Sequence, residues 1–554
     1  MPSDRFPQGK RRKREEEFGH LLQQEHSLNA GFLHGLKGQI VEIQARAVEV
    51  LYSPRPWPGA VVITGMERGD AEQALLRINA ALTKYGMNKS PVVIQVHCTP
   101  AMLSKYGSWL DLPLAIILLQ CAGYLPDLPP TVEGDYVLVG ELGLHGEVRR
   151  VPGILAIAEA TRPEQTLIVP TGNERECALI AASPGRQHGR IAAVSMLDEV
   201  IEFFQGKRTF DNVLNQLISL EPFGKKPIDF GRIKGQEQAK EAALLCAAGG
   251  HNLLFIGPPG EGKSLLANAI AGILPRLTVE EQLELTRIYS AAGQLERDGQ
   301  IVTQRPFRAV HHTISKQALV GGGTLKLQPG EVTLAHLGIL FLDELPEFRR
   351  DTLEALRQPL ESGQITISRT HAAFTFPCRF TLVAAMNPCP CGYAGTERCT
   401  CSPTAVAKYQ KRLSGPLLDR IDLVVELQPL TLEERFSETT DGQTELLRQK
   451  VEAARARQTA RFQGTAIGCN AAIPAGRILD YCRFSPAGLE HYKQRVAQAN
   501  ISTRLTDRLA RVARTIADLD NSDSIEPPHV DRAATFVLDQ RLNFAPAAET
   551  ESPA

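Results

Sequence analysis

Long apolar segments are missing from this chain of 554 residues. Its longest candidate, residues 112–119, is far shorter than the ~20 consecutive apolar residues that a membrane-spanning helix requires. The amino terminus also lacks the apolar stretch of a secretory signal, because basic residues 10–14 lead directly into acidic residues 15–17. These absences predict a protein without membrane partners that works in the reducing cytoplasm.

An excess of charge of either sign is absent as well. The chain carries 61 Lys and Arg residues against 62 Asp and Glu residues, a net charge of -1. No attraction of the whole chain to nucleic acid follows from this balance, so any basic surface must be local. The hydrophobic fraction of 43% is ordinary for a folded protein. At roughly 100–200 residues per domain, the length predicts three or four domains.

Cysteine is too sparse for a disulfide scaffold, with 11 residues in the whole chain. Two Cys-x-Cys pairs nevertheless lie close together, and their members are Cys389, Cys391, Cys399 and Cys401. Together they supply enough thiolates for a closed tetrahedral Zn²⁺ site. Four reduced thiols on a loop are the alternative. The preference of clustered soft thiolates for a metal favours zinc.

The periodicity along the chain predicts an α/β protein with several domains, because strand-like and helix-like runs alternate over most of its length. The expected segments are a disordered charged leader (1–27), an α/β domain (28–206), a linker (207–230), a second α/β block (231–430), a helical domain (431–543) and a disordered tail (544–554).

The second α/β block contains a phosphate-binding loop. An apolar strand at residues 253–256 precedes it and an apolar helix at 265–274 follows it, which is the context that a P-loop requires. The loop is Gly257-Pro258-Pro259-Gly260-Glu261-Gly262-Lys263-Ser264. We expect its backbone N–H groups to bind the phosphates of ATP, Lys263 to reach the β/γ oxygens, and Ser264 to ligate Mg²⁺. A glycine-rich turn without function does not explain this order of elements.

Two further apolar strands end in polar residues that suit the same chemistry. Residues 338–342 lead into Asp343 and Glu344, which we expect to support Mg²⁺ and to polarise the attacking water, respectively. Residues 380–385 lead to Asn387, whose amide would sense the γ-phosphate. A turn cap before Pro388 is the alternative role of Asn387.

A candidate arginine finger follows in the sequence at Arg420. A guanidinium there would reach the nucleotide of a neighbouring subunit, which would make the enzyme oligomeric. The alternative is a surface arginine paired with Asp419 or Asp422, an interaction that contributes little.

Several motifs together resemble the ComM/YifB-type magnesium-chelatase-like AAA+ ATPases. They are DFGRIKGQEQAK (229–240), AGGHNL (248–253), RAVHHT (308–313) and LPEF (345–348). The resemblance covers about residues 40–540 and implies a P-loop AAA+ module with a parallel sheet and a helical C-terminal lid. It also implies ATP and Mg²⁺, a hexameric ring and DNA as the partner. In ComM the implied activity is that of a branch-migration helicase that aids recombination during natural transformation.

The resemblance assigns roles to further residues. Arg504 stands where the family places a second sensor that reads the γ-phosphate in cis, with Arg508 and Arg511 as nearby competitors. Glu261 departs from the small or hydroxyl residue usual in this P-loop, and its carboxylate would weaken ATP binding if it turned inward. Residues 321–323, flanked by Lys316 and Lys326, form either a pore loop that touches phosphates or a plain surface hairpin.

The amino-terminal domain resembles the Lon-protease fold, in residues 140–149 and 168–173. The positions of the Lon catalytic dyad hold Trp109 and Ala156, which supply neither a nucleophile nor a base. Ser108 lies one position away but has no lysine partner. The expectation is a non-proteolytic scaffold or DNA-docking domain.

A second function remains open, that of a chelatase-like or chaperone-like ATPase that remodels a protein partner. Residues 520–524 match the Asp-x-Ser-x-Ser pattern of the metal domain in chelatase partner subunits. The match follows a helical pattern, and only about 30 residues remain after it, too few for such a domain.

Overall fold

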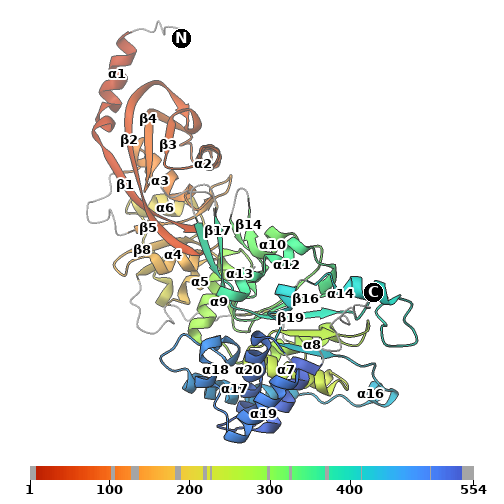
Figure 1. Ribbon diagram of the computed structural model, residues 1–554. Helices are drawn as coiled ribbons and strands as arrows, with labels where there is room; N and C mark the ends of the chain where they lie inside the picture. Colours follow the sequence, from red (N-terminus) through yellow and green to blue (C-terminus); the bar gives the residue numbers. More distant parts are fainter. Residues whose placement is uncertain are drawn as a thin grey trace.

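The computed structural model describes residues 8–100, 107–126, 136–180, 189–215, 221–224, 227–295, 300–323, 327–368, 373–413, 415–499 and 501–539. Figure 1 shows an amino-terminal domain in red and orange at one end, a central part in green and cyan, and a helical part in blue.

The amino-terminal domain is built on a mixed seven-stranded sheet with the order β3-β4-β2-β1-β5-β8-β9. Its elements are α1 (Gln8–Phe18), η1 (Gly19–Gln23), β1 (Glu25–His34), β2 (Lys37–Pro56), η2 (Trp57–Gly59), β3 (Val61–Thr64), α2 (Arg68–Thr83), β4 (Lys89–Thr99), α3 (Asp111–Cys121), β5 (Tyr136–Leu138), β6 (Glu141–Leu142), β7 (Val148–Arg149), α4 (Ile154–Ala160), β8 (Thr166–Pro170), α5 (Glu174–Ala178), β9 (Arg190–Val194), α6 (Leu197–Phe204) and η3 (Val213–Asn215). Every residue of α3 is buried, so this apolar helix forms the centre of the domain core.

Residues 8–27 differ from the expected disordered leader. They form α1, η1 and the start of β1, a strand that pairs along its whole length with β2. Two contacts explain the order: Arg14 Nη1 donates to the carbonyl of Leu51 over 3.1 Å, and Leu21 is buried in the domain core. Residues 1–7 and the predicted tail at 544–554 lie outside the described residues.

The predicted linker also contains a strand. Residues 221–223 form β10, which pairs in parallel with β12 of the central part. The ring of Phe223 packs edge-on against Tyr289 with centroids 5.3 Å apart, so this segment is held to the central part by an aromatic contact.

The central part is an α/β unit around a five-stranded sheet with the order β13-β16-β19-β11-β20, in which every neighbouring pair is parallel. Its elements are β10 (Glu221–Phe223), η4 (Phe230–Arg232), α7 (Glu237–Gly249), β11 (Leu253–Ile256), α8 (Lys263–Ile273), α9 (Val279–Ala291), β12 (Gln300–Val302), β13 (Phe307–Val310), α10 (Lys316–Val320), β14 (Gly321–Gly322), β15 (Gln328–Pro329), α11 (Glu331–Leu334), β16 (Ile339–Leu342), η5 (Leu345–Glu347), α12 (Arg350–Glu354), α13 (Arg357–Ser362), β17 (Gln364–Ser368), β18 (Ala373–Pro377), β19 (Thr381–Met386), α14 (Pro403–Gln410), α15 (Gly415–Leu418) and β20 (Leu423–Glu426). All residues of β11 and β16 are buried, which explains their unbroken apolar sequences.

The carboxyl-terminal part is helical, as predicted. Its elements are α16 (Leu432–Phe436), α17 (Gln443–Arg461), η6 (Asn470–Ala472), η7 (Ala475–Arg477), α18 (Ile478–Tyr481), α19 (Pro486–Ala499), α20 (Thr503–Leu519), α21 (Pro527–Ala534) and a π-helical turn, η8 (Thr535–Asp539). The helix α20 packs on the central part, where the buried ring of His251 lies 2.8 Å from Thr515 Oγ1. None of the helices in the described ranges combines the length and apolar character needed to cross a bilayer.

The amino-terminal domain docks on α9 of the central part. The backbone N–H of Gly153, just before α4, donates to Ser290 Oγ over 3.1 Å, and Arg287 forms an ion pair with Glu159 at 2.8 Å. Ser290 is buried and also contacts the buried carboxylate of Glu176. Because these polar groups are buried with partners, separating the domains would leave them unsatisfied, and this interface is therefore specific.

Candidate nucleotide site

Three adjacent strands bring the predicted site residues to one edge of the central sheet. β16, β19 and β11 lie side by side and run parallel, so their carboxyl ends meet. The P-loop follows β11, Asp343 and Glu344 follow β16, and Asn387 follows β19. This is the edge at which open α/β sheets bind ligands.

Lys263 is the centre of a compact hydrogen-bond cluster. Its Nζ donates to the carbonyls of Gly257 and Pro258 over 2.6 and 2.8 Å and to Asn387 Oδ1 over 3.0 Å. The residue is only 9% exposed. Burial lowers the pKa of Lys263, while the carboxylates of Asp343, Glu261 and Glu344 oppose that shift. The ammonium group of Lys263 is therefore enclosed among hydrogen-bond acceptors at this edge of the sheet.

The loop backbone has the conformation that a phosphate cradle needs. Gly260 and Gly262 have φ values of +86° and +87°, a region that residues with a Cβ rarely adopt. No other atom lies within 4 Å of the position that a Cβ would occupy at either residue, so the backbone here faces open space. Gly262 precedes α8, whose first N–H groups point toward this space.

A hydroxyl and a carboxylate stand together where Mg²⁺ is expected. Ser264 Oγ donates to Asp343 Oδ2 over 2.9 Å, although the two residues are far apart in the chain. Oxygen donors of this kind suit a hard divalent cation. Glu344 follows with a left-handed backbone, φ 52°, and its N–H donates to Asp343 Oδ1 over 2.9 Å.

Glu261 points toward the start of the helical part. Its carboxylate accepts from the N–H of Leu430 over 3.3 Å and lies 3.8 Å from Arg435 Nη2. These contacts offset part of the negative charge that the loop would otherwise present to phosphates.

Arg420 and Arg504 belong to a different cluster from Lys263. Arg420 forms an ion pair with Glu361 of α13, and Arg504 pairs with Asp419 at 2.8 Å. Burial and the nearby cations Arg357, Arg504 and Arg508 lower the pKa of Arg420. The partner of Arg420 is therefore neither of the two aspartates considered from the sequence. Arg508 takes one of these, Asp422, at 3.4 Å.

The four clustered cysteines lie together beside the nucleotide site. Their sulfur atoms are all within 4.8 Å of one another, with Cys389 and Cys391 separated by 3.3 Å. Backbone hydrogen bonds from Thr400 and Tyr393 lower the pKa of Cys391 to about 6. The same loop touches the P-loop, because a Cβ on Gly392 would lie 2.7 Å from Pro259 Cδ.

His312 is a site residue that sequence reasoning did not single out. Its Nδ1 lies 3.0 Å from Glu344 Oε2. The residue occurs in the RAVHHT motif, which the sequence analysis used only as a mark of resemblance. The sequence signal was weak, because the strand before His312, β13, contains Arg308 and is only partly buried, unlike β11 and β16.

The glycine segment at 321–323 begins a small hairpin, in which β14 pairs antiparallel with β15. Lys316 starts α10 just before it, and Lys326 lies outside the described residues. The Asp-x-Ser-x-Ser match forms a turn whose Ser522 and Asp523 carbonyls accept hydrogen bonds from Arg514, so this turn has a structural role.

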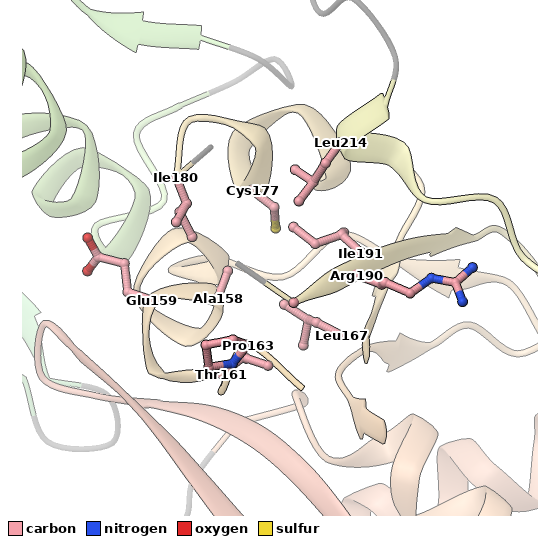
Figure 2. A pocket seen from close by; sticks show the side chains of 11 residues that line it. Ala158, Glu159, Thr161, Pro163, Leu167, Cys177, Ile180, Arg190, Ile191 and Leu214 are labelled. Carbon is pink, nitrogen blue, oxygen red and sulfur yellow. The ribbon is translucent and has the colours of Figure 1, made fainter. Parts of the chain in front are cut away.

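The two residues that the sequence aligned with the Lon dyad lie in the core of the amino-terminal domain. Trp109 and Ala156 are buried, and Trp109 Nε1 donates to the carbonyl of Pro152 over 2.9 Å. The Ser108 hydroxyl donates to Glu141. A hollow of about 200 Å³ in this domain is lined mainly by apolar side chains around Cys177 and Ile191 (Figure 2), and it contains none of the predicted site residues.

Comparisons with known proteins agree with this architecture. Residues 229–435 match the family model "Magnesium chelatase, subunit ChlI", residues 441–536 match its C-terminal model, and residues 48–173 match a model for subunit ChlI of Mg-chelatase. The protein YifB of Salmonella typhimurium is 39% identical over 491 residues, covering 88% of this chain and 92% of the relative. The competence protein ComM of Haemophilus influenzae is 39% identical over 493 residues, covering 88% and 93%. The magnesium-chelatase 38 kDa subunit of Cereibacter sphaeroides is 25% identical over 349 residues, covering 59% and 96%.

Proposed function

Because the chain belongs to the ComM/YifB-type magnesium-chelatase-like AAA+ proteins, we propose that it is an ATP-hydrolysing motor that acts on DNA. The observation that carries the proposal is the convergence of Lys263, the Ser264–Asp343 pair and Asn387 at one sheet edge. The DNA assignment rests on the relationship to a competence protein, since the chain as a whole is electrically neutral. Branch migration during recombination is the activity that this relationship favours.

The geometry supports a simple division of labour in hydrolysis. The loop N–H groups and Lys263 bind the phosphates of ATP, with Lys263 exchanging its present acceptors for phosphate oxygens. Ser264 and Asp343 would hold Mg²⁺, which neutralises charge on the β- and γ-phosphates when bound. Glu344 accepts a proton from the water that attacks the γ-phosphorus. The bond between the γ-phosphorus and the β–γ bridging oxygen then breaks, which releases ADP and phosphate. Asn387 orients the same water.

Arg420 would complete the site from a neighbouring subunit. It lies in an arginine cluster outside the group around Lys263, which suits a residue that acts across an interface. We assign Arg504 a sensor role at the nucleotide. It would read the γ-phosphate in cis, as the family resemblance implies, whereas Arg420 would serve the nucleotide of the neighbouring subunit. This arrangement requires a closed ring, for which the family suggests six subunits.

The cysteine cluster would hold one structural Zn²⁺. Four thiolates with short mutual distances match a closed tetrahedral site without an open coordination position. Since this loop follows Asn387 in the chain and approaches Pro259 of the P-loop, the ion would stabilise the nucleotide site from outside. The amino-terminal domain, for which we propose a non-proteolytic Lon-like fold, would act as a scaffold or dock DNA.

The decisive experiment measures ATPase activity of the full chain with no DNA and with single-stranded, duplex or branched DNA. Turnover that DNA stimulates, and that Glu344→Gln abolishes while ATP binding persists, supports the motor. Turnover that no DNA changes would favour the second function, remodelling of a protein partner, which the similarity to a magnesium-chelatase subunit brings into consideration. Absence of turnover under all conditions would refute both.

A further inference from the structure

Two adjoining cavities lie at the edge of the central sheet opposite the P-loop. Each has a volume of about 320 Å³, and both are lined by Gln304 and Arg305. These two residues precede β13, and Ala271, which also lines both cavities, lies near the end of α8, so the cavities are at the amino ends of the strands. We infer that the cavities together form a second ligand site, and that its ligand is a nucleoside monophosphate whose base carries an amino group.

The first cavity suits the base of such a ligand. Three aromatic rings line it, those of Phe223, Tyr289 and Phe307. They belong to β10, α9 and β13, so each of three separate elements contributes one ring. Every nucleobase has a π-face that packs favourably on aromatic side chains. The volume of the cavity is also in the range of small-molecule sites, which begins at about 300 Å³.

Gln304 supplies an unused hydrogen-bond acceptor between the two cavities. Its Oε1 is buried and accepts no hydrogen bond from the residues that the structure describes. A buried acceptor without a donor destabilises a fold, which is why most such groups are paired. The amino groups of adenine, guanine and cytosine are donors of the required kind. A base in the first cavity would bring this donor to the Gln304 amide, because that amide borders the cavity.

The second cavity suits the phosphate. Arg276, Arg305 and Arg448 line it, and among the described residues no carboxylate lines either cavity. Arg305 is held by two backbone carbonyls and by Glu281, so it forms a fixed wall. The side chain of Arg276 is 68% exposed, and within the described part of the chain it donates only through Nη2, to Glu445 over 2.8 Å. The remaining N–H groups of its guanidinium can therefore bind an anion.

The test is isothermal titration of AMP, GMP and CMP into the full chain and into Lys263→Ala, whose P-loop has lost its phosphate-binding ammonium group. We expect at least one of these nucleotides to bind one site per chain in both proteins, with a Kd between about 10 μM and 1 mM. The two Kd values should agree within about twofold, because Lys263 lies at the other edge of the sheet. Ribose 5-phosphate, which lacks the base, should bind about tenfold more weakly or less.

Two variants locate the ligand. Gln304→Leu should raise the Kd by about three- to tenfold, because the base loses its acceptor. Without ligand this variant should unfold at a temperature no lower than that of wild type, since an unpaired buried oxygen is removed. Arg276→Met should raise the Kd by about the same factor and remain folded, because the side chain is exposed. Arg477→Met is the matched control, because Arg477 is 56% exposed, pairs with Asp480 and lines neither cavity; the Kd should not change.

The site would be overturned if none of the three nucleotides binds at millimolar concentration. Binding that Lys263→Ala abolishes would place the ligand at the P-loop, and binding that neither Gln304→Leu nor Arg276→Met weakens would place it elsewhere on the chain. Equal affinity for ribose 5-phosphate would contradict the role of the aromatic cavity. If Gln304→Leu does not fold, the comparison of Arg276→Met with Arg477→Met decides. These titrations require no ATP hydrolysis, so failure of the proposed ATPase function would leave their outcome unaffected.

Discussion

Removal of the Asn387 side chain should change nucleotide affinity and turnover in opposite directions. Asn387 Oδ1 is one of three acceptors for Lys263 Nζ, at 3.0 Å. ATP must compete with these acceptors for the ammonium group. A hydrogen bond to a charged group contributes about 1.5–3 kcal/mol, so Asn387→Ala removes at least ~1.5 kcal/mol of competition. The Kd for ATP should therefore fall by about tenfold or more.

Turnover of the same variant should decrease. If Asn387 orients the attacking water, the loss of this one polar group lowers kcat by about 10²–10³-fold. Isothermal titration with a non-hydrolysable ATP analogue measures the affinity, and steady-state kinetics measures kcat. Asn470→Ala is the matched control, because the buried Asn470 side chain donates to Thr515 Oγ1 and Asp518 Oδ2 of the helical part, at 3.1 and 2.8 Å. It should lower thermal stability without the opposed pair of effects. Unchanged kcat with weaker ATP binding would show that Asn387 merely caps a turn.

Other regions of the chain give equally definite expectations. Chelator-washed protein should retain about one equivalent of zinc per chain. The variant Cys389→Ser should lose both the zinc and the ATPase activity, whereas the control Cys469→Ser should keep both. A metal-free protein that is active would contradict the zinc site. Arg420→Ala and Lys263→Ala should each be inactive, and mixing them should restore some ATPase activity. Co-assembled mixtures that stay inactive at every ratio would refute action in trans. Arg77→Met removes the ion-pair partner of the buried Asp111 carboxylate, which lies 2.6 Å from Arg77 Nε. The free energy of unfolding, measured by urea denaturation, should decrease by about 3 kcal/mol. A decrease below about 1 kcal/mol would contradict this expectation.

The convergence of the candidate site residues was predictable because its signals are local in sequence. Buried parallel strands have unbroken apolar sequences, so polar residues directly after such strands indicate a functional edge of the sheet. This pattern located the P-loop, Asp343 and Asn387, which the structure brings together. The amphipathic pattern of α20 likewise predicted a helix, although its burial extends beyond one face, since all of residues 508–518 except Arg511 are buried.

Pairings between distant elements were not predictable in the same way. The contact of His312 with Glu344 depends on β13 being the neighbour of β16 in the sheet. This strand order cannot be read from the sequence of either segment. Arg420 pairs with Glu361, a residue on α13 that no spacing rule connects to it. The expectation of a disordered leader differed from the structure for a similar reason. The charge of α1 predicts a solvated segment, whereas the hydrogen bond from Arg14 to β2 is a contact between distant parts of the sequence.

The docking of the amino-terminal domain on α9 has a mechanical consequence. That helix belongs to the nucleotide-binding part, and its far end inserts Ser290 between Gly153 and Glu176. The hydrogen-bonded groups of this interface are buried, so any sliding or rotation of the two parts against each other would leave them without partners. If ATP hydrolysis by the proposed ATPase tilts the central sheet, the amino-terminal domain would therefore move together with α9.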